Sequence, residues 1–272
     1  MGLRVNQNIA AFNSYRNLSV TDGQMSKSLE KLSSGFRINR AADDAAGLAI
    51  SEGLRSQVGG LKVAVRNAQD GVSVVQTAEG ALTETHAILQ RMRDLAVQAA
   101  NDGSLDTNAK AAADAEYQQL SAEITDIANK TNFNGVKLLD GSFNKAFQVG
   151  ANAGDTLTVN LGTASDAATL GATGDLTTAA NATTAIGKLD TAITTVSTTR
   201  ANLGATQNRL EHKINNLNVA VENLSASESR IRDTDMASEM VNFTRSQILS
   251  QAGTAMLAQA NQAPQNVLQL LK

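Results

Sequence analysis

One heptad stripe constrains the fold of this chain more than any other sequence feature. Alternating steps of four and three residues separate its members, with Glu79 and His86 at the skipped positions: Leu54, Val58, Leu61, Val65, Ala68, Val72, Val75, Leu82 and Leu89. Such spacing predicts a single long helix whose apolar seam packs against other helices. A helix from Leu54 to Ala99 would be about 69 Å long, whereas a compact domain of this size has a radius of gyration of about 18 Å. The stripe therefore predicts an elongated helical bundle rather than a compact globule.

Three further stripes predict partners for this helix. Their members are Leu18, Met25, Leu29, Leu32 and Phe36; then Ala113, Tyr117, Leu120, Ile124 and Ile127; then Ile186, Leu189, Ile193, Val196, Leu203, Leu210, Ile214, Leu217, Val221 and Leu224. Arg200 and Gln207 interrupt the last stripe. Turns around residues 101–107 and before Ile186 would reverse the chain. The predicted fold is therefore mainly α, an elongated bundle of long antiparallel coiled-coil helices.

The predicted β structure lies between these helices. Residues 146–161, AFQVGANAGDTLTVNL, alternate apolar and polar residues on both sides of a Gly/Asn/Asp-rich turn, as a β-hairpin does. Residues 162–185, the next segment of the chain, contain no Lys, Arg or aromatic residue. We interpret them as too poor for a core and predict a short exposed segment.

Composition and charge argue against several classes of partner. The net charge of -3 gives no reason to expect a nucleic-acid partner. Residues 246–271 are uncharged, a run longer than the roughly 20 residues of a membrane span. Eight Asn and Gln side chains interrupt that run, so we predict no membrane segment. The first 18 residues contain no continuous apolar stretch, and no cleaved signal peptide is expected.

Residues that could carry catalysis are sparse. The chain has no Cys and only two histidines, His86 and His212, and it contains none of the common zinc-hydrolase or phosphate-binding motifs. Asp43 and Asp44 are neighbours, which do not face each other on a helix. We interpret Asp43 as a cap or first-turn residue of the long helix. The sequence therefore predicts a protein that is not an enzyme, with no cofactor and no metal.

Several long motifs resemble those of bacterial flagellins. They are LSSGFRINRAADDAAGLAISEGLRSQ at 32–57, RNAQDGVSVVQTAEGAL at 66–82, NFNGVKLLDGS at 132–142, QVGANAGDTL from residue 148, SRIRDTDMASEM from 229, and SQILSQAGTAMLAQANQAPQNVLQLLK from 246. The resemblance covers residues 1–161 and 186–272 in the order that the family shows. It departs in the middle, where many flagellins insert large outer domains and this chain has only residues 162–185.

The resemblance implies a structural subunit that polymerises into the flagellar filament, the helical propeller for swimming. In the family the two chain ends pair as a coiled coil, so residues 1–43 and 232–272 would form an inner domain. Residues 44–161 and 186–231 would form an outer rod with a hairpin at 146–161, and residues 162–185 would be its exposed segment. The protein would be secreted through the flagellar export apparatus and lie outside the cell. Its implied partners are other copies of itself, an export chaperone, the filament cap and hook-junction proteins.

Three sets of functional residues are expected from the stripes and the resemblance. The expected polymerisation and coiled-coil seam comprises Leu18, Met25, Leu29, Leu32, Phe36, Ile248, Leu257, Val267, Leu268 and Leu271. A surface for an innate immune receptor would include Arg91, Leu95 and Glu123, although a role in helix surface and packing is the favoured reason for these residues. Glycans, where present, would lie on Thr163, Ser165, Thr169, Thr173, Thr177, Thr178, Thr183 and Thr184.

Two alternative functions stay open at the level of the sequence. A flagellar hook-filament junction protein would share the terminal similarity and the rod, and its position at one junction would distinguish it. An enzyme carried on a flagellin frame is disfavoured, because residues 162–185 are too few to build a site.

Overall fold

A computed structural model describes residues 7–103, 105–162 and 164–270, with side chains to residue 262. The chain is mainly helical (74%), which confirms the predicted fold class. Its elements are α1 (Ile9–Ser34), α2 (Ala45–Ala100), α3 (Thr107–Lys130), β1 (Asn132–Phe133), β2 (Val136–Lys137), β3 (Asn144–Gln148), β4 (Thr156–Asn160), α4 (Ala179–Arg232) and α5 (Met236–Leu270). They fall into two compact units, one made of Met1–Ser56 with Asn223–Lys272 and the other of Gln57–Glu222.

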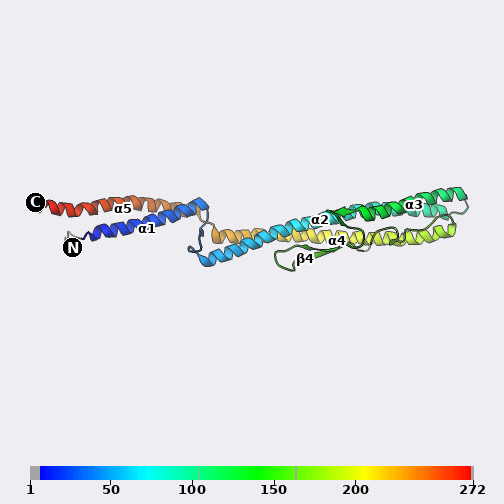
Figure 1. Cartoon of the computed structure of the whole chain (residues 1–272), viewed down its shortest axis with the longest axis horizontal. Coiled ribbons are helices and arrows are strands. Elements are labelled where there is room, and N and C mark those ends of the chain that lie inside the picture. The colour runs from blue at the N-terminus through cyan, green and yellow to red at the C-terminus, as the bar shows by residue number, and fades with distance from the viewer. Residues whose placement is uncertain (1–6, 104, 163, 271–272) are drawn as a thin grey trace. The chain divides into compact units, whose positions relative to one another are not determined.

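The first unit is built on the pairing of α1 with α5, which lie side by side (Figure 1). Asn8 caps α1, because its Oδ1 accepts a hydrogen bond from the Ala11 N–H at 3.1 Å. Gly35 ends the helix in the left-handed region (φ 76°) and donates its N–H to the Lys31 carbonyl at 2.8 Å. Phe36 lies beyond this cap, so the expectation that it continues the helical stripe is wrong.

Small and polar contacts align α1 with α5. A Cβ placed on Gly253 would lie 3.2 Å from Leu18 Cδ1, so glycine allows the two helices to approach closely there. The Ser250 hydroxyl donates to Asp22 Oδ1 at 2.9 Å. Lys31 and Glu239 form an ion pair at 3.9 Å. The predicted pairing of the amino- and carboxy-terminal helices is confirmed.

The ends of α1 and α4 are tied together in the same unit. The Arg37 N–H donates to the Arg232 carbonyl at 2.7 Å, and the Thr234 N–H donates to the Gly35 carbonyl at 2.9 Å. The Arg232 guanidinium lies 4.8 Å from the centre of the Phe36 ring and 2.5 Å from Glu52 Oε1. The backbone bonds and the cation–π contact therefore hold these two helix ends together, and the ion pair links the end of α4 to α2.

The start of α2 is capped by Asp44 rather than by Asp43, which corrects the interpretation of the sequence. Asp44 Oδ1 accepts a hydrogen bond from the Gly47 N–H at 2.8 Å. Asp43 Oδ2 instead accepts from the backbone of Arg40 and Asn39 in the preceding turn. The bond from the Arg40 N–H lowers the pKa of Asp43.

The second unit is organised by a seam between α2 and α4. The predicted stripes meet here, and Leu82, Leu89, Leu203 and Leu210 are fully buried. Glu79 and Arg200 interrupt their respective stripes, and they form an ion pair at 3.6 Å. The two opposite charges therefore face each other across the seam.

The predicted hairpin is present as an antiparallel pair of β3 and β4, with Phe147 opposite Leu157. It packs on α2: the Asn67 side chain donates to the Gln148 carbonyl at 3.0 Å, and Gly60 leaves room for Ala151. A second, shorter hairpin of β1 and β2 was not predicted. Its Asn134–Gly135 turn has two positive φ angles, 49° and 79°, and Asn-Gly is the sequence signal for such a turn.

Residues 162–185 contribute to the core of the second unit, so the interpretation that they are too poor for one is wrong. Buried side chains in this range are Ser165, Ala167, Leu170, Ala172, Leu176, Ala182 and Ala185. Backbone contacts hold the segment in place: the Leu176 N–H donates to Asp114 Oδ1 at 2.8 Å, and the Ser165 N–H donates to the Leu139 carbonyl at 2.9 Å. Small side chains suffice for burial, because the segment lies close against neighbouring elements.

Candidate functional site

Large apolar side chains are exposed mainly on α1 and α5. We call this set the terminal apolar face; on α1 it comprises Ile9, Phe12, Tyr15, Val20 and Leu29, and on α5 Met236, Met240, Val241, Ile248, Leu249 and Met256. Phe12 is 73% exposed and Ile248 is 60% exposed. A concentration of exposed apolar side chains on one helix pair is typical of a protein–protein interaction surface.

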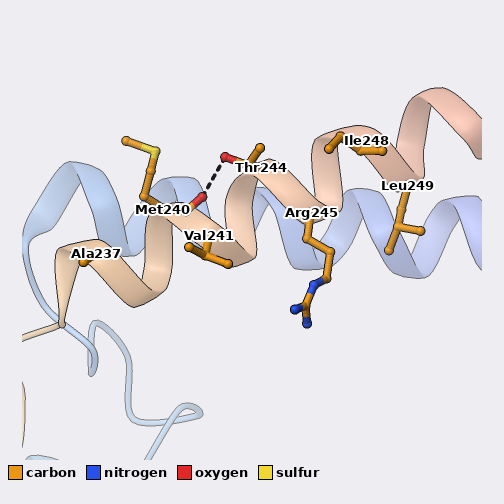
Figure 2. Close-up of a pocket in the computed structure, with 7 residues that line it drawn as sticks. All are labelled: Ala237, Met240, Val241, Thr244, Arg245, Ile248 and Leu249. Atoms are coloured by element: carbon orange, nitrogen blue, oxygen red, sulfur yellow. Dashed lines mark hydrogen bonds between the residues drawn. The ribbon is translucent and has the colours of Figure 1, made fainter.

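Seven α5 residues line a shallow, largely apolar groove (Figure 2). They are Ala237, Met240, Val241, Thr244, Arg245, Ile248 and Leu249. Their spacing of three and four residues places them along one stripe of the helix. The Thr244 hydroxyl donates to the Met240 carbonyl at 2.8 Å, so its hydrogen-bonding capacity is used within the helix and its methyl group adds to the stripe. The groove can therefore receive apolar side chains without leaving this hydroxyl unsatisfied.

Both helices carry more apolar residues than their mutual contact can cover. In α1 the half-buried residues Leu18, Met25 and Leu32 recur every seven residues, whereas Phe12 and Tyr15 lie off that row. A helix with two apolar stripes needs two sets of partners. The α1·α5 contact supplies one of them, and the other stripe remains open.

A cationic rim borders this face. A second groove is lined by three cations, Lys27, Lys31 and Arg245. It also contains the nearly buried carboxylate of Glu239 and two buried hydroxyl residues, Ser28 and Ser246. Three cations accompany one carboxylate, so a surface that packs here has to tolerate positive charge. The terminal face is therefore apolar in its middle and charged at this edge.

The predicted seam residues take different positions. Leu18, Met25, Leu32 and Leu257 are half-buried, whereas Leu29 is 56% exposed and Ile248 lies on the open stripe. Phe36 is 38% exposed beneath the Arg232 guanidinium. Val267 and Leu268 lie in α5 beyond the last described side chain, and Leu271 lies outside the described residues.

The suggested receptor residues are not all on the surface. Arg91 is exposed and pairs with Glu116 at 2.7 Å, which links α2 to α3. Glu123 is also exposed. Leu95 is 3% exposed in the core of the second unit, so it is not accessible to a partner of the folded chain.

The suggested glycan acceptors also divide by burial. Ser165 is 4% exposed, which removes it as an acceptor in the folded chain. Thr169, Thr173, Thr177, Thr178, Thr183 and Thr184 are exposed. Thr163 lies outside the described residues.

Other kinds of site find little support. Within residues 7–103, 105–162 and 164–270, no group of three or more His, Asp or Glu side chains could hold a metal ion. His86 Nε2 lies 3.0 Å from the Gln90 side-chain amide. In the part of the chain that the structure describes, no helix is long and apolar enough to cross a membrane.

Sequence reasoning missed much of the terminal apolar face. Phe12, Tyr15, Met240, Val241 and Leu249 belong to no stripe that heptad spacing singled out. The available signal was apolar residues at helical spacing on a second side of each helix, three residues apart for Phe12 and Tyr15 and eight apart for Val241 and Leu249. A search for one stripe per helix cannot detect it.

Comparison with known proteins gives matches over nearly the whole chain. The bacterial flagellin N-terminal helical region matches residues 5–144, and the bacterial flagellin C-terminal helical region matches residues 186–271. A flagellin of Bacillus subtilis is 53% identical over 99% of this chain and 100% of its own length. A flagellin of Halalkalibacterium halodurans is 54% identical over 98% of this chain and 99% of its own length. The crystal structure of Bacillus cereus flagellin is 42% identical and covers 56% of this chain and 88% of its own, with a TM-score of 0.51.

Proposed function

Because this chain belongs to the bacterial flagellin family, we propose that its terminal apolar face is the main surface through which subunits pack in the filament. Flagellins are the subunits of the flagellar filament, which lies outside the cell. The chain is accordingly a structural protein that polymerises with itself and not an enzyme. The full-length similarity to flagellins favours this function over a hook-filament junction protein.

The observation that carries the proposal is the open apolar stripe on α1 and α5. An isolated chain leaves Phe12, Tyr15 and Ile248 more than half exposed to water. Covering such side chains is favourable by about 25 cal/mol per Å² of apolar surface. Since the chain polymerises with itself, another copy is a partner that is always available.

We further propose an inner domain of residues 1–43 and 232–272 and an outer domain of residues 44–161 and 186–231, to whose core the buried side chains of residues 162–185 contribute. The α1·α5 pairing supports the inner domain, since these helices lie in one compact unit. The seam residues Leu18, Met25, Leu32 and Leu257 would then hold the pair together. Leu29, Ile248, Val267, Leu268 and Leu271 would contact neighbouring subunits.

The remaining partners are proposals of the same kind. An export chaperone would cover the apolar stripe of α5 before assembly, when no neighbouring copy protects it. The filament cap and hook-junction proteins would meet the same terminal helices at the two ends of the filament. An immune receptor would contact Arg91 and Glu123, which are exposed in the second unit. Glycans would lie on the exposed threonines between Thr169 and Thr184.

The absence of cysteine makes a direct test possible. Single Ile248→Cys and Thr173→Cys variants, both at exposed positions, are labelled with a maleimide as monomers and after regrowth into filaments. We expect the thiol at 248 to become protected on assembly and the thiol at 173 to stay reactive. Electron microscopy confirms that filaments have formed. A thiol at 248 that reacts equally fast in monomer and filament would refute the proposed contact surface.

A further inference from the structure

Asn8 joins the two ends of the chain through one side chain. Its Oδ1 accepts from the Ala11 N–H at 3.1 Å and so caps α1, while its Nδ2 donates to the Ala260 carbonyl of α5 at 2.7 Å. The two groups of one amide therefore serve two helices. The second bond spans 252 positions of sequence, so local structure does not require it.

The Ala260 carbonyl needs such a donor because the residue one helical turn later cannot supply one. In an α-helix this carbonyl would accept from the N–H four residues later. That residue is Pro264, the only proline of the chain, and proline has no N–H. Since α5 continues to Leu270, the carbonyl lies within the helix and not at its end. Asn8 supplies the hydrogen bond that Pro264 cannot give.

We propose that Asn8 and Pro264 together set the register of the α1·α5 pair. A seam of heptad type can slip by seven residues, about 10 Å along the axis, and still match apolar residues with apolar residues. One polar contact at a defined level makes such a slip unfavourable. Pro264 marks the level on α5 by freeing one carbonyl, and Asn8 recognises that level from α1.

The register decides which residues share the terminal apolar face. Phe12 and Tyr15 of α1 lie soon after Asn8, and Met256 of α5 precedes Ala260 by one turn. A slipped pair would displace the aromatic residues from the methionine. This consequence rests on the proposed function, whereas the register itself does not.

The test separates the cap from the bond to α5. Asn8→Asp keeps an oxygen that can cap Ala11 but removes the Nδ2 donor. We expect it to raise the monomer concentration needed for filament growth by about three- to tenfold. Asn8→Ser, which also caps without adding charge, should act in the same direction. Pro264→Ala restores an N–H for the Ala260 carbonyl, so in that background the penalty of Asn8→Asp should fall below about twofold.

A disulfide readout reports the register directly in filaments, independently of the concentration needed for growth. Leu18→Cys with Gly253→Cys pairs residues that touch in the native register, whereas Leu18→Cys with Ser246→Cys reports a slip of one heptad. We expect the parent to form the first disulfide and Asn8→Asp to gain the second in filaments. If Asn8→Asp prevents growth, Asn8→Ala with and without Pro264→Ala is compared instead.

Two results would overturn the proposal. One is a growth penalty for Asn8→Asp that is equally large beside Pro264→Ala, which would mean that the penalty does not come from losing the bond to the Ala260 carbonyl. The other is an unchanged disulfide pattern in Asn8→Asp. A slip detected by disulfides together with an unprotected thiol at position 248 would keep the register proposal and reject the proposed contact surface.

Discussion

Truncating Ile248 to alanine should weaken filament growth by an amount that depends on its exposure. Ile248 is 60% exposed in the chain, so about that fraction of its side chain is left for a neighbouring subunit to cover. The change removes three carbon groups, each worth about 0.8 kcal/mol when fully buried. The loss for a 60% exposed side chain is therefore about 1.4 kcal/mol per added subunit. We expect a roughly tenfold rise in the monomer concentration at which filaments grow.

Seeded elongation followed by sedimentation measures this concentration. Gln247→Ala is the matched control, because it is an exposed neighbour on α5 that also becomes alanine. It should leave the growth concentration within about twofold. Circular dichroism of the monomers shows whether either change alters helix content.

An Ile248→Ala chain that elongates like the control would refute the reasoning. It would mean that the open stripe of α5 stays in contact with water in the filament. Loss of helix in the monomer would instead assign Ile248 a role within the subunit.

Two further predictions concern the second unit. Burial raises the pKa of Tyr117 to about 12, whereas an ordinary tyrosine in the unfolded chain has a pKa of about 10. As pH rises, the unfolded chain therefore loses this proton before the folded chain does. The free energy of unfolding should fall as pH rises between these two values. Tyr117→Phe should abolish that fall and raise the free energy of unfolding by about 1 kcal/mol at neutral pH. The reason is that the buried Tyr117 hydroxyl has no hydrogen-bond partner among the described residues. Urea unfolding at several pH values measures both effects. Leu176→Ala should cost about 2–5 kcal/mol, since Leu176 is fully buried, whereas exposed Thr173→Ala should be neutral; equal urea midpoints would mean that residues 162–185 are dispensable.

The helices and the main hairpin could be predicted because their signals are local. The stripe from Leu54 to Leu89 records which side of α2 is apolar, and the turn between β3 and β4 carries glycines and polar residues between alternating strands. Backbone geometry converts such periods directly into a helix or a strand. The β1–β2 hairpin carries a turn signal in Asn134–Gly135, but its strands of two residues each are too short to show an alternating pattern.

Burial of residues 162–185 could not be read in this way. Alanine and threonine give little apolar signal, yet Ala167 and Ala172 are fully enclosed. Their burial depends on how closely the segment approaches Asp114 and Leu139, which are distant in sequence. Packing density, not side-chain size, makes this segment part of the core.

The sequence by itself determined that this chain forms long helices with apolar stripes, and its motifs identified the family. Only the tertiary structure decided which polar groups meet, as the Glu79 side chain does with Arg200 and the Asn8 side chain with the Ala260 carbonyl. It also decided which stripe of α1 and α5 remains uncovered. The physical reason is that a helical period fixes the direction of a side chain relative to its own axis, whereas its partner depends on the register of a second helix far away in the chain.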